Sequence, residues 1–161
     1  MTTLENKSPT KVLDTLDRKI LQCLEHDGRI SFATLGEHIG LSKTPCWNRV
    51  NDLLKHGIIE GYSTRIDPAK LGLTIRALVH VVVDFSFYQA FEAAIIAHPN
   101  VRSCQAVTGD YDYVLEILAT DIHAFDRLLR ENLSQLPGVE RFNTAISTRL
   151  VKSNGPYTAM D

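Results

Sequence analysis

Residues 31–57 read SFATLGEHIGLSKTPCWNRVNDLLKHG, and this stretch decides the fold of the first half of the chain. Ser31 is a typical cap for a short helix whose apolar residues face inward, and a turn at Gly40 follows. Ser42 is then expected to cap a longer helix, with Pro45 in its first turn, where a missing N–H does no harm. A short helix, a turn of about three residues with glycine and a longer helix predict a helix-turn-helix.

The residues on either side of this stretch extend the unit. Upstream, apolar side chains recur at helical spacing from Leu13 to Leu24, Asp14 and Asp17 suit the helix start, and Asp27 precedes the glycine that ends it. Downstream, residues 58–66 predict two short strands that turn near a glycine and form a small wing. Residues 12–67 therefore predict a winged helix-turn-helix.

The outward face of the longer helix carries the polar and basic groups that suit a DNA groove. Hydroxyl, amide and basic side chains near a helix N-terminus fit phosphate contacts and base-edge readout. Residues 42–65 hold four bases and two acids, in a first half whose charges balance. An alternative is that the tryptophan packs on a neighbouring helix and the asparagine is merely solvated. The candidate DNA-binding residues are Ser42, Lys43, Thr44, Trp47 and Asn48, with Arg49 on the flank of this face and Lys55 and Arg65 at phosphates.

The second half alternates strands and helices. Strands are expected at 74–85, 101–107, 113–119 and 139–152, and helices at 88–98 and from 121 to the Pro-Gly pair at 137–138. The order β-α-β-β-α-β is that of the ferredoxin-like split βαβ fold. The expected class is thus α+β, a winged helix-turn-helix joined to a ferredoxin-like βαββαβ domain.

One face of that predicted sheet has no helix to cover it. Leu78, Val82, Val114 and Leu118 fall on this face, and they form an apolar patch too broad for a small soluble monomer to leave in water. The economical cover is the same sheet of a second copy, arranged with two-fold symmetry. Such a dimer presents two recognition helices, which suits two half-sites about one or more helical turns (~34 Å) apart.

Composition excludes several classes of protein. The chain has 161 residues, is 44% hydrophobic and 22% charged, and carries a net charge of −2, as ordinary globular chains do. No apolar run approaches a membrane span, and the polar N-terminus lacks the core of a secretory signal. Three cysteines without a close pair fit a reducing cytoplasm.

Five residue runs, in the order that this fold requires, resemble the Lrp/AsnC (feast/famine) family of transcription regulators. The resemblance covers about residues 12–152. The runs are 16–21 (LDRKIL), 39–42 (IGLS), 49–59 (RVNDLLKHGII), 66–72 (IDPAKLG) and 109–113 (GDYDY).

The resemblance implies a domain layout and a ligand. It implies a DNA-binding domain at 12–67, a hinge at 68–73 and an effector-binding and oligomerisation domain at 74–152. From the residues themselves, 1–11 are expected to be a flexible N-terminus and 153–161 a loose tail. The implied effector is an amino acid held between neighbouring dimers, beside the glycine turn. Backbone N–H groups at a glycine turn suit a carboxylate, and an aspartate suits an ammonium group. The candidate effector residues are Thr108, Gly109, Asp110, Tyr111 and Asp112, with Ser147 and Thr148 from the last strand.

Two alternatives stay open at this stage. Asp112 would have no role in ligand binding if it only caps the turn. The winged helix would serve protein contacts if the chain were a small-molecule-binding module that does not bind DNA. Cys23 and His26 have a metal-like local spacing, but no second pair follows, so no metal is expected. No nucleophile motif or phosphate loop supports an enzyme.

The sequence thus predicts a regulator of amino-acid metabolism that is not an enzyme. Its expected partners are double-stranded DNA, an amino acid or related small molecule, and copies of itself, as a homodimer that assembles further, to an octamer in the implied family pattern. No cofactor, metal or membrane is expected, and the expected location is the cytoplasm, in association with the nucleoid.

Overall fold

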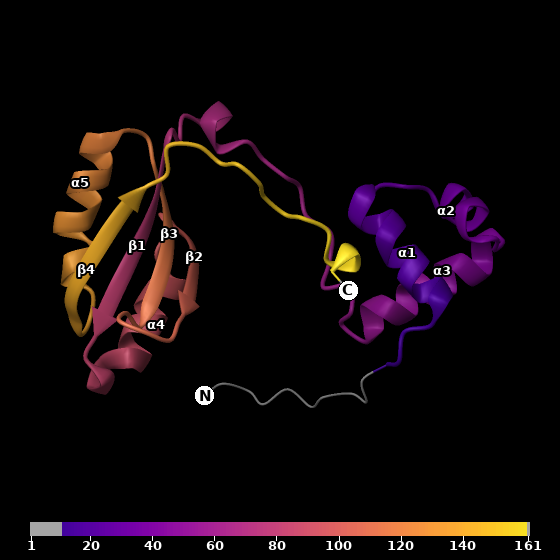
Figure 1. Cartoon of the computed structure of the whole chain (residues 1–161), viewed down its shortest axis with the longest axis horizontal. Helices are drawn as coiled ribbons and strands as arrows, with labels where there is room; N and C mark the ends of the chain where they lie inside the picture. The colour runs from indigo at the N-terminus through magenta and orange to yellow at the C-terminus, as the bar shows by residue number, and fades with distance from the viewer. Residues whose placement is uncertain (1–10, 161) are drawn as a thin grey trace. The chain divides into compact units, whose positions relative to one another are not determined.

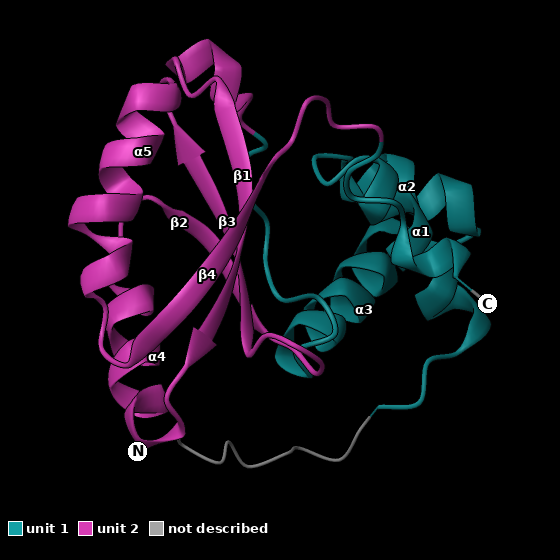
Figure 2. Ribbon diagram, turned by 60° about the vertical axis from the view of Figure 1, so that its left-hand side comes forward, with its two compact units in different colours: residues 1–65, 152–161 teal, residues 66–151 magenta. Residues whose placement is uncertain are grey.

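The computed structural model describes residues 11–160, which form two compact units (Figure 2). One unit holds the chain up to Arg65 together with the segment from Lys152 onward, and the other is Ile66–Val151. The expected flexible segment 1–11 lies outside the described residues except for Lys11. The ammonium of Lys11 is ion-paired with Asp17 and Asp52, so this residue belongs to the first unit. No described helix has the length and apolarity to cross a bilayer.

The first unit contains three helices, α1 (Thr15–His26), α2 (Phe32–Ile39) and α3 (Lys43–Lys55) (Figure 1). Asp14 accepts the backbone N–H of Asp17, and Ser31 accepts that of Thr34, so the expected side-chain caps of α1 and α2 are present. The three helices enclose a small core. Its buried apolar residues are Ile20, Leu35, Ile39, Cys46, Val50 and Leu53.

The turn between α2 and α3 is tight because Gly40 adopts a left-handed conformation, with φ of 76°. The Leu41 N–H then reaches back to the Gly36 carbonyl at 2.8 Å. This closes the expected helix-turn-helix and sets the first turn of α3 at the surface.

The expected wing strands do not form. Residues 58–67 have no strand, although Ile58 and Ile59 pack on the helical core and their N–H groups bond to Leu53. An isolated two-stranded ribbon is only marginally stable in water, and the described unit offers no third strand to support it. The prediction of a β-wing was therefore wrong, and an irregular segment occupies its place.

The second unit is a four-stranded antiparallel sheet with the order β2-β3-β1-β4. The strands are β1 (Ile75–Val83), β2 (Val101–Ala106), β3 (Tyr113–Ala119) and β4 (Val139–Ile146), and the main helices are α4 (Tyr88–Ile96) and α5 (Ile122–Glu131). This is the predicted ferredoxin-like arrangement, reached through a short 3-10 helix at Pro68–Leu71.

Both helices cover the same face of the sheet (Figures 1 and 2). Alternate residues of β1 and β3, from Ala77 to Val83 and from Tyr113 to Ala119, are buried beneath them with Phe91 and Phe125. The residues in between point to the other face, where Leu78 keeps 42% of its surface exposed. No described element of this unit covers that second face, as the sequence predicted.

The C-terminal segment, expected to be loose, is attached to α1. A short 3-10 helix, Tyr157–Ala159, presents its first N–H groups to the carboxylate of Glu25. The Tyr157 and Thr158 N–H groups donate to Glu25 at 2.7 and 2.9 Å, and the Thr158 hydroxyl donates as well. Glu25 thus caps a helix 132 positions further along the chain, a contact that no local pattern announces.

We expect Glu25→Ala to release this segment. Hydrogen–deuterium exchange of the Tyr157 and Thr158 amides should accelerate, because Glu25 is their acceptor. The hydrogen bonds from Thr158 lower the pKa of Glu25, with a further contribution from the Tyr157 N–H. A carboxylate with a lowered pKa stabilises the attachment at neutral pH and loses this effect as the pH falls through that pKa, so acid should release the wild-type segment too. Glu37→Ala, on the exposed side of α2, is the matched control, and unchanged exchange in Glu25→Ala would contradict the attachment.

Candidate nucleic-acid interface and ligand site

The outward face of α3 is exposed as predicted. Trp47 is 49% exposed, so about half of its surface faces solvent and the rest is covered by neighbouring residues. Lys43, Thr44 and Asn48 are exposed beside it. An indole, an amide, a hydroxyl and an ammonium group therefore share the N-terminal half of one helix, where recognition helices meet base edges.

The expected cap at Ser42 does not form, because its side chain makes no hydrogen bond to the start of α3. A capping side chain accepts the N–H of the second or third helical residue, and here the third is Pro45, which has none. The Ser42 hydroxyl is therefore not engaged in a cap and lies beside the first N–H groups of the helix. Those N–H groups and the helix dipole favour an anion such as a phosphate.

The other two expected phosphate contacts lie away from this end. Lys55 is exposed at the last position of α3, roughly 18 Å along the axis from Lys43 at 1.5 Å per residue. Arg65 is exposed in the irregular segment that replaces the wing. Their spread matches contacts to different phosphates along a duplex backbone.

Arg49 is not on the outward face. At 100° per residue it points well away from Trp47, and its Nη1 lies 2.7 Å from Asp14 Oδ2 and 2.8 Å from Asp17 Oδ1. Asp17 is 1% exposed, so its charge needs a partner. Through these ion pairs Arg49 joins α3 to the start of α1.

The turn between β2 and β3 is tied to the end of β1 by Asp112. Its carboxylate accepts the Val83 N–H at 2.9 Å, and its own N–H donates to the Val81 carbonyl at 2.9 Å. The Asp112 carboxylate therefore anchors the turn to β1, which differs from the cap within the turn that the alternative interpretation described. Gly109, with φ of 121°, supplies the left-handed residue that the turn needs.

The same turn leans over the open face of the sheet. The Tyr111 ring lies 5.2 Å from that of His80, centroid to centroid, and the Arg141 guanidinium lies 5.4 Å above it. Arg141 also donates to the backbone carbonyl of Asp110 at 3.3 Å. The side chains of Asp110 and Thr108 are exposed. The turn presents a carboxylate, a hydroxyl and glycine backbone at one end of the sheet.

Ser147 and Thr148 lie at the opposite end of the sheet. The Ser147 N–H donates to the Arg76 carbonyl near the start of β1, whereas Asp112 binds Val81 near its end. Five residues of strand separate these positions by about 17 Å. One chain therefore does not bring the two groups of candidate effector residues together, and a site that uses both takes them from different copies.

No three or more His, Cys, Asp or Glu side chains cluster at metal-binding distances in the described range 11–160. Cys23 packs against the helical core, and burial raises the pKa of the nearby Cys46 thiol. Both cysteines are small core residues here.

Comparison with known proteins assigns both halves of the chain. Residues 13–54 match the AsnC-type helix-turn-helix domain, and residues 76–157 match the Lrp/AsnC ligand binding domain. The leucine-responsive regulatory proteins of Salmonella typhimurium and Klebsiella pneumoniae are each 36% identical to this chain over 151 residues, which is 92% of both sequences.

Solved structures agree along nearly the whole chain. A transcriptional regulator of Neisseria meningitidis in complex with L-Met superposes with a TM-score of 0.86 at 31% identity, covering 90% of this chain and 96% of that one. LrpC of B. subtilis gives 0.80 at 28% identity, with 89% and 99% covered.

A helix-turn-helix with an exposed polar recognition face, joined to a separate ligand-binding domain, defines a transcription regulator. The chain belongs to the Lrp/AsnC family. Its relatives are regulators of transcription and not enzymes.

Proposed function

We propose that this regulator binds double-stranded DNA through the N-terminal half of α3 and the residues next to it. The supporting observation is the free outward face, on which Trp47 and Asn48 are exposed and the Ser42 hydroxyl is left without a capping role. In this proposal Asn48 and Trp47 contact base edges, and the helix N-terminus holds a phosphate. Lys43, Thr44, Lys55 and Arg65 complete the contact, and Arg49 positions the helix.

The second part of the proposal concerns assembly. The open face of the sheet, with Leu78, Val82, Val114 and Leu118, is covered by the same face of a second copy. Dimers associate further, to an octamer in the fullest form, and each added copy raises the effective concentration of recognition helices on DNA.

The third part concerns the effector, which we propose is an amino acid. The turn from Thr108 to Asp112 of one subunit binds it together with Ser147 and Thr148 of another. This accounts for two groups of polar residues that lie at opposite ends of one sheet. The N. meningitidis relative was solved with L-Met, which supports an amino acid as the class of ligand. The regulated genes are then those of amino-acid metabolism, and the protein acts in the cytoplasm on the nucleoid.

Fluorescence anisotropy with a labelled duplex tests the DNA-binding part. Wild-type affinity should fall steeply with salt, because each neutralised phosphate releases a counterion. Trp47→Ala and Asn48→Ala should each weaken binding to a selected site by roughly tenfold or more, since a lost base contact costs about 1–3 kcal/mol. Arg130→Ala, whose guanidinium pairs with Asp126 on α5, is the control.

Two outcomes would count against this proposal. If the duplex does not bind even at low salt, the helix-turn-helix has another partner, and the protein-contact alternative takes its place. If both variants bind like the wild type, DNA is contacted by another surface.

A further inference from the structure

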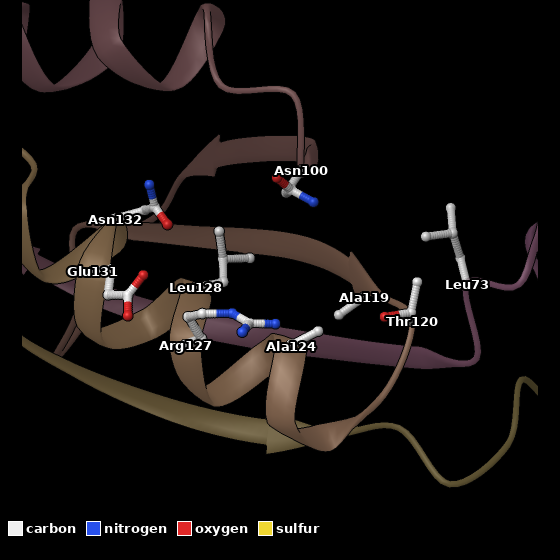
Figure 3. Close-up of a pocket in the computed structure, with 9 residues that line it drawn as sticks. All are labelled: Leu73, Asn100, Ala119, Thr120, Ala124, Arg127, Leu128, Glu131 and Asn132. Atoms are coloured by element: carbon white, nitrogen blue, oxygen red, sulfur yellow. The ribbon is translucent and has the colours of Figure 1, made fainter.

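A hollow of about 270 Å³ lies in the second unit, on the helix-covered side of the sheet and away from the glycine turn. Figure 3 shows it between α5, the end of β3 and the loop before β2. It lies at the end of the sheet where β1 begins, because Ala119 of β3 pairs with Ile75. The lining residues are Leu73, Asn100, Ala119, Thr120, Ala124, Arg127, Leu128, Glu131 and Asn132.

The floor of this hollow is apolar. Ala119 and Leu128 are 4% and 8% exposed and belong to the core of the unit. Leu73 and Ala124 extend the apolar surface on either side (Figure 3). The hollow therefore offers a small hydrocarbon floor beneath a lining that is mostly polar, and the floor suits an apolar group of a few carbons.

The rim carries two opposite charges that do not pair with each other. Arg127 and Glu131 are one turn apart on α5, yet neither has an ion pair within residues 11–160. Arg130, on the same helix, does pair with Asp126 at 3.0 Å. In Figure 3 the Arg127 guanidinium extends toward Ala124, whereas the Glu131 carboxylate lies further along the helix. The rim thus presents a cation and an anion at separate points.

Neutral polar groups complete the rim. The side chains of Asn100, Asn132 and Thr120 offer amide and hydroxyl donors and acceptors around the same opening (Figure 3). A small apolar floor with a few converging polar groups is the usual composition of a ligand site. The opposite charges specify the ligand, because a guanidinium binds a carboxylate and a carboxylate binds an ammonium.

We propose that this hollow binds a small zwitterion the size of an amino acid. Its carboxylate meets Arg127, its ammonium meets Glu131, and its apolar part covers Ala119 and Leu128. The site is separate from the glycine turn, and it is built from one chain alone. Two kinds of zwitterion fit this chemistry: one with its two charged groups on the same carbon atom, as in an α-amino acid, and one with its charges at opposite ends of the chain. The experiment below distinguishes between them.

The position of the hollow links it to the hinge. Leu73 directly follows Gly72, whose φ of 78° ends the short 3-10 helix of the expected hinge at 68–73. The next residue, Thr74, donates its hydroxyl to the Thr120 carbonyl on the rim at 2.5 Å. A ligand here contacts the residues on which the hinge ends, so its binding energy bears on the hinge conformation.

Isothermal titration calorimetry of the full-length protein tests the site. The probes are L-leucine, its decarboxylated and deaminated analogues 3-methylbutan-1-amine and 4-methylpentanoate, and 6-aminohexanoate, whose charges are far apart. One of the two zwitterions should bind, and each analogue with a single charge should bind at least about tenfold more weakly. Arg127→Ala and Glu131→Gln should each cause a similar loss, while Arg130→Ala should not.

Two further measurements keep the result unambiguous. Ligand should slow hydrogen–deuterium exchange at 73–76 and 119–132 in the wild-type protein. This measurement does not depend on whether a variant folds. Asp110→Ala, in the glycine turn, should leave this protection in place. Protection confined to 107–112, or affinity that is unchanged in Arg127→Ala, would overturn the hollow as a site and leave the proposed effector turn standing. The absence of heat and protection with all four probes would overturn it as well.

Discussion

Replacing Arg49 by alanine should destabilise the DNA-binding unit by about 2 kcal/mol and weaken DNA binding, although this side chain points away from the recognition face. The reason is Asp17, a carboxylate that is 1% exposed. Without the guanidinium 2.8 Å away, its remaining cation is Lys11 at 3.2 Å. Breaking a buried ion pair costs about 3–5 kcal/mol. The expected loss of stability is smaller here, because Arg49 is partly exposed and Lys11 still pairs with Asp17.

Urea unfolding and duplex anisotropy together check this expectation. The urea midpoint of unfolding of Arg49→Ala should fall. In the double variant with Asp17→Asn, the loss of stability caused by Arg49→Ala should be smaller, because an unpaired neutral amide costs less than an unpaired carboxylate. Arg18→Ala, exposed on α1, is the control. The salt dependence of DNA binding should keep its slope. The opposite result is a salt dependence of DNA binding that is weaker by about one phosphate contact, with an unchanged unfolding midpoint. It would show that Arg49 contacts DNA directly, as the sequence predicted.

The features that the sequence predicted well are those set by neighbours in the chain. The caps at Asp14, Ser31 and Asp121 follow from side chains that bond N–H groups three residues on. The alternation from Ala77 to Val83 predicts which side of β1 is buried, because successive side chains point to opposite faces. These rules need no knowledge of distant residues.

Strand lengths were less well predicted because a strand ends where its partner ends. The first strand was expected to run from 74 to 85 and the last to run to 152, but pairing between them stops at Ala77–Ile146 and Val83–Val139. Phe85 continues the alternating pattern and is nevertheless 86% exposed, since it lies beyond the last paired residue. The wing failed for a related reason, as its two segments had no third strand to pair with.

The candidate sites were predictable in residue type but not in position. Arg49 and Lys43 are both basic residues of one helix, and only the burial of Asp17 separates a positioning role from a DNA contact. That burial was the available signal, because an aspartate on an apolar helical stripe needs a cation. The hollow beside Arg127 and the attachment of Thr158 to Glu25 join residues far apart in the chain, so no local pattern pointed to either.

Replacing Leu78 by aspartate should convert the protein into monomers. Leu78 lies on β1, an inner strand of the sheet, and is 42% exposed on the face that we propose meets a second copy. A two-fold interface uses each residue twice, so one change removes two buried leucines, each contributing about 1.5–3 kcal/mol, and places two charges in the contact. The new carboxylate also lies directly across from Glu116, which adds repulsion between like charges.

Sedimentation velocity measures this outcome. The variant should sediment as a single protomer and bind a two-half-site duplex far more weakly, because the linked second recognition helix is lost. Its unfolding midpoint should be compared at one protomer concentration, since dimerisation itself stabilises the fold. Ile96→Asp is the matched control, because Ile96 is 87% exposed on α4, which packs on the other side of the sheet. If Leu78→Asp keeps the wild-type mass, copies associate through another surface. That other surface would then have to bring together the candidate effector residues of two subunits.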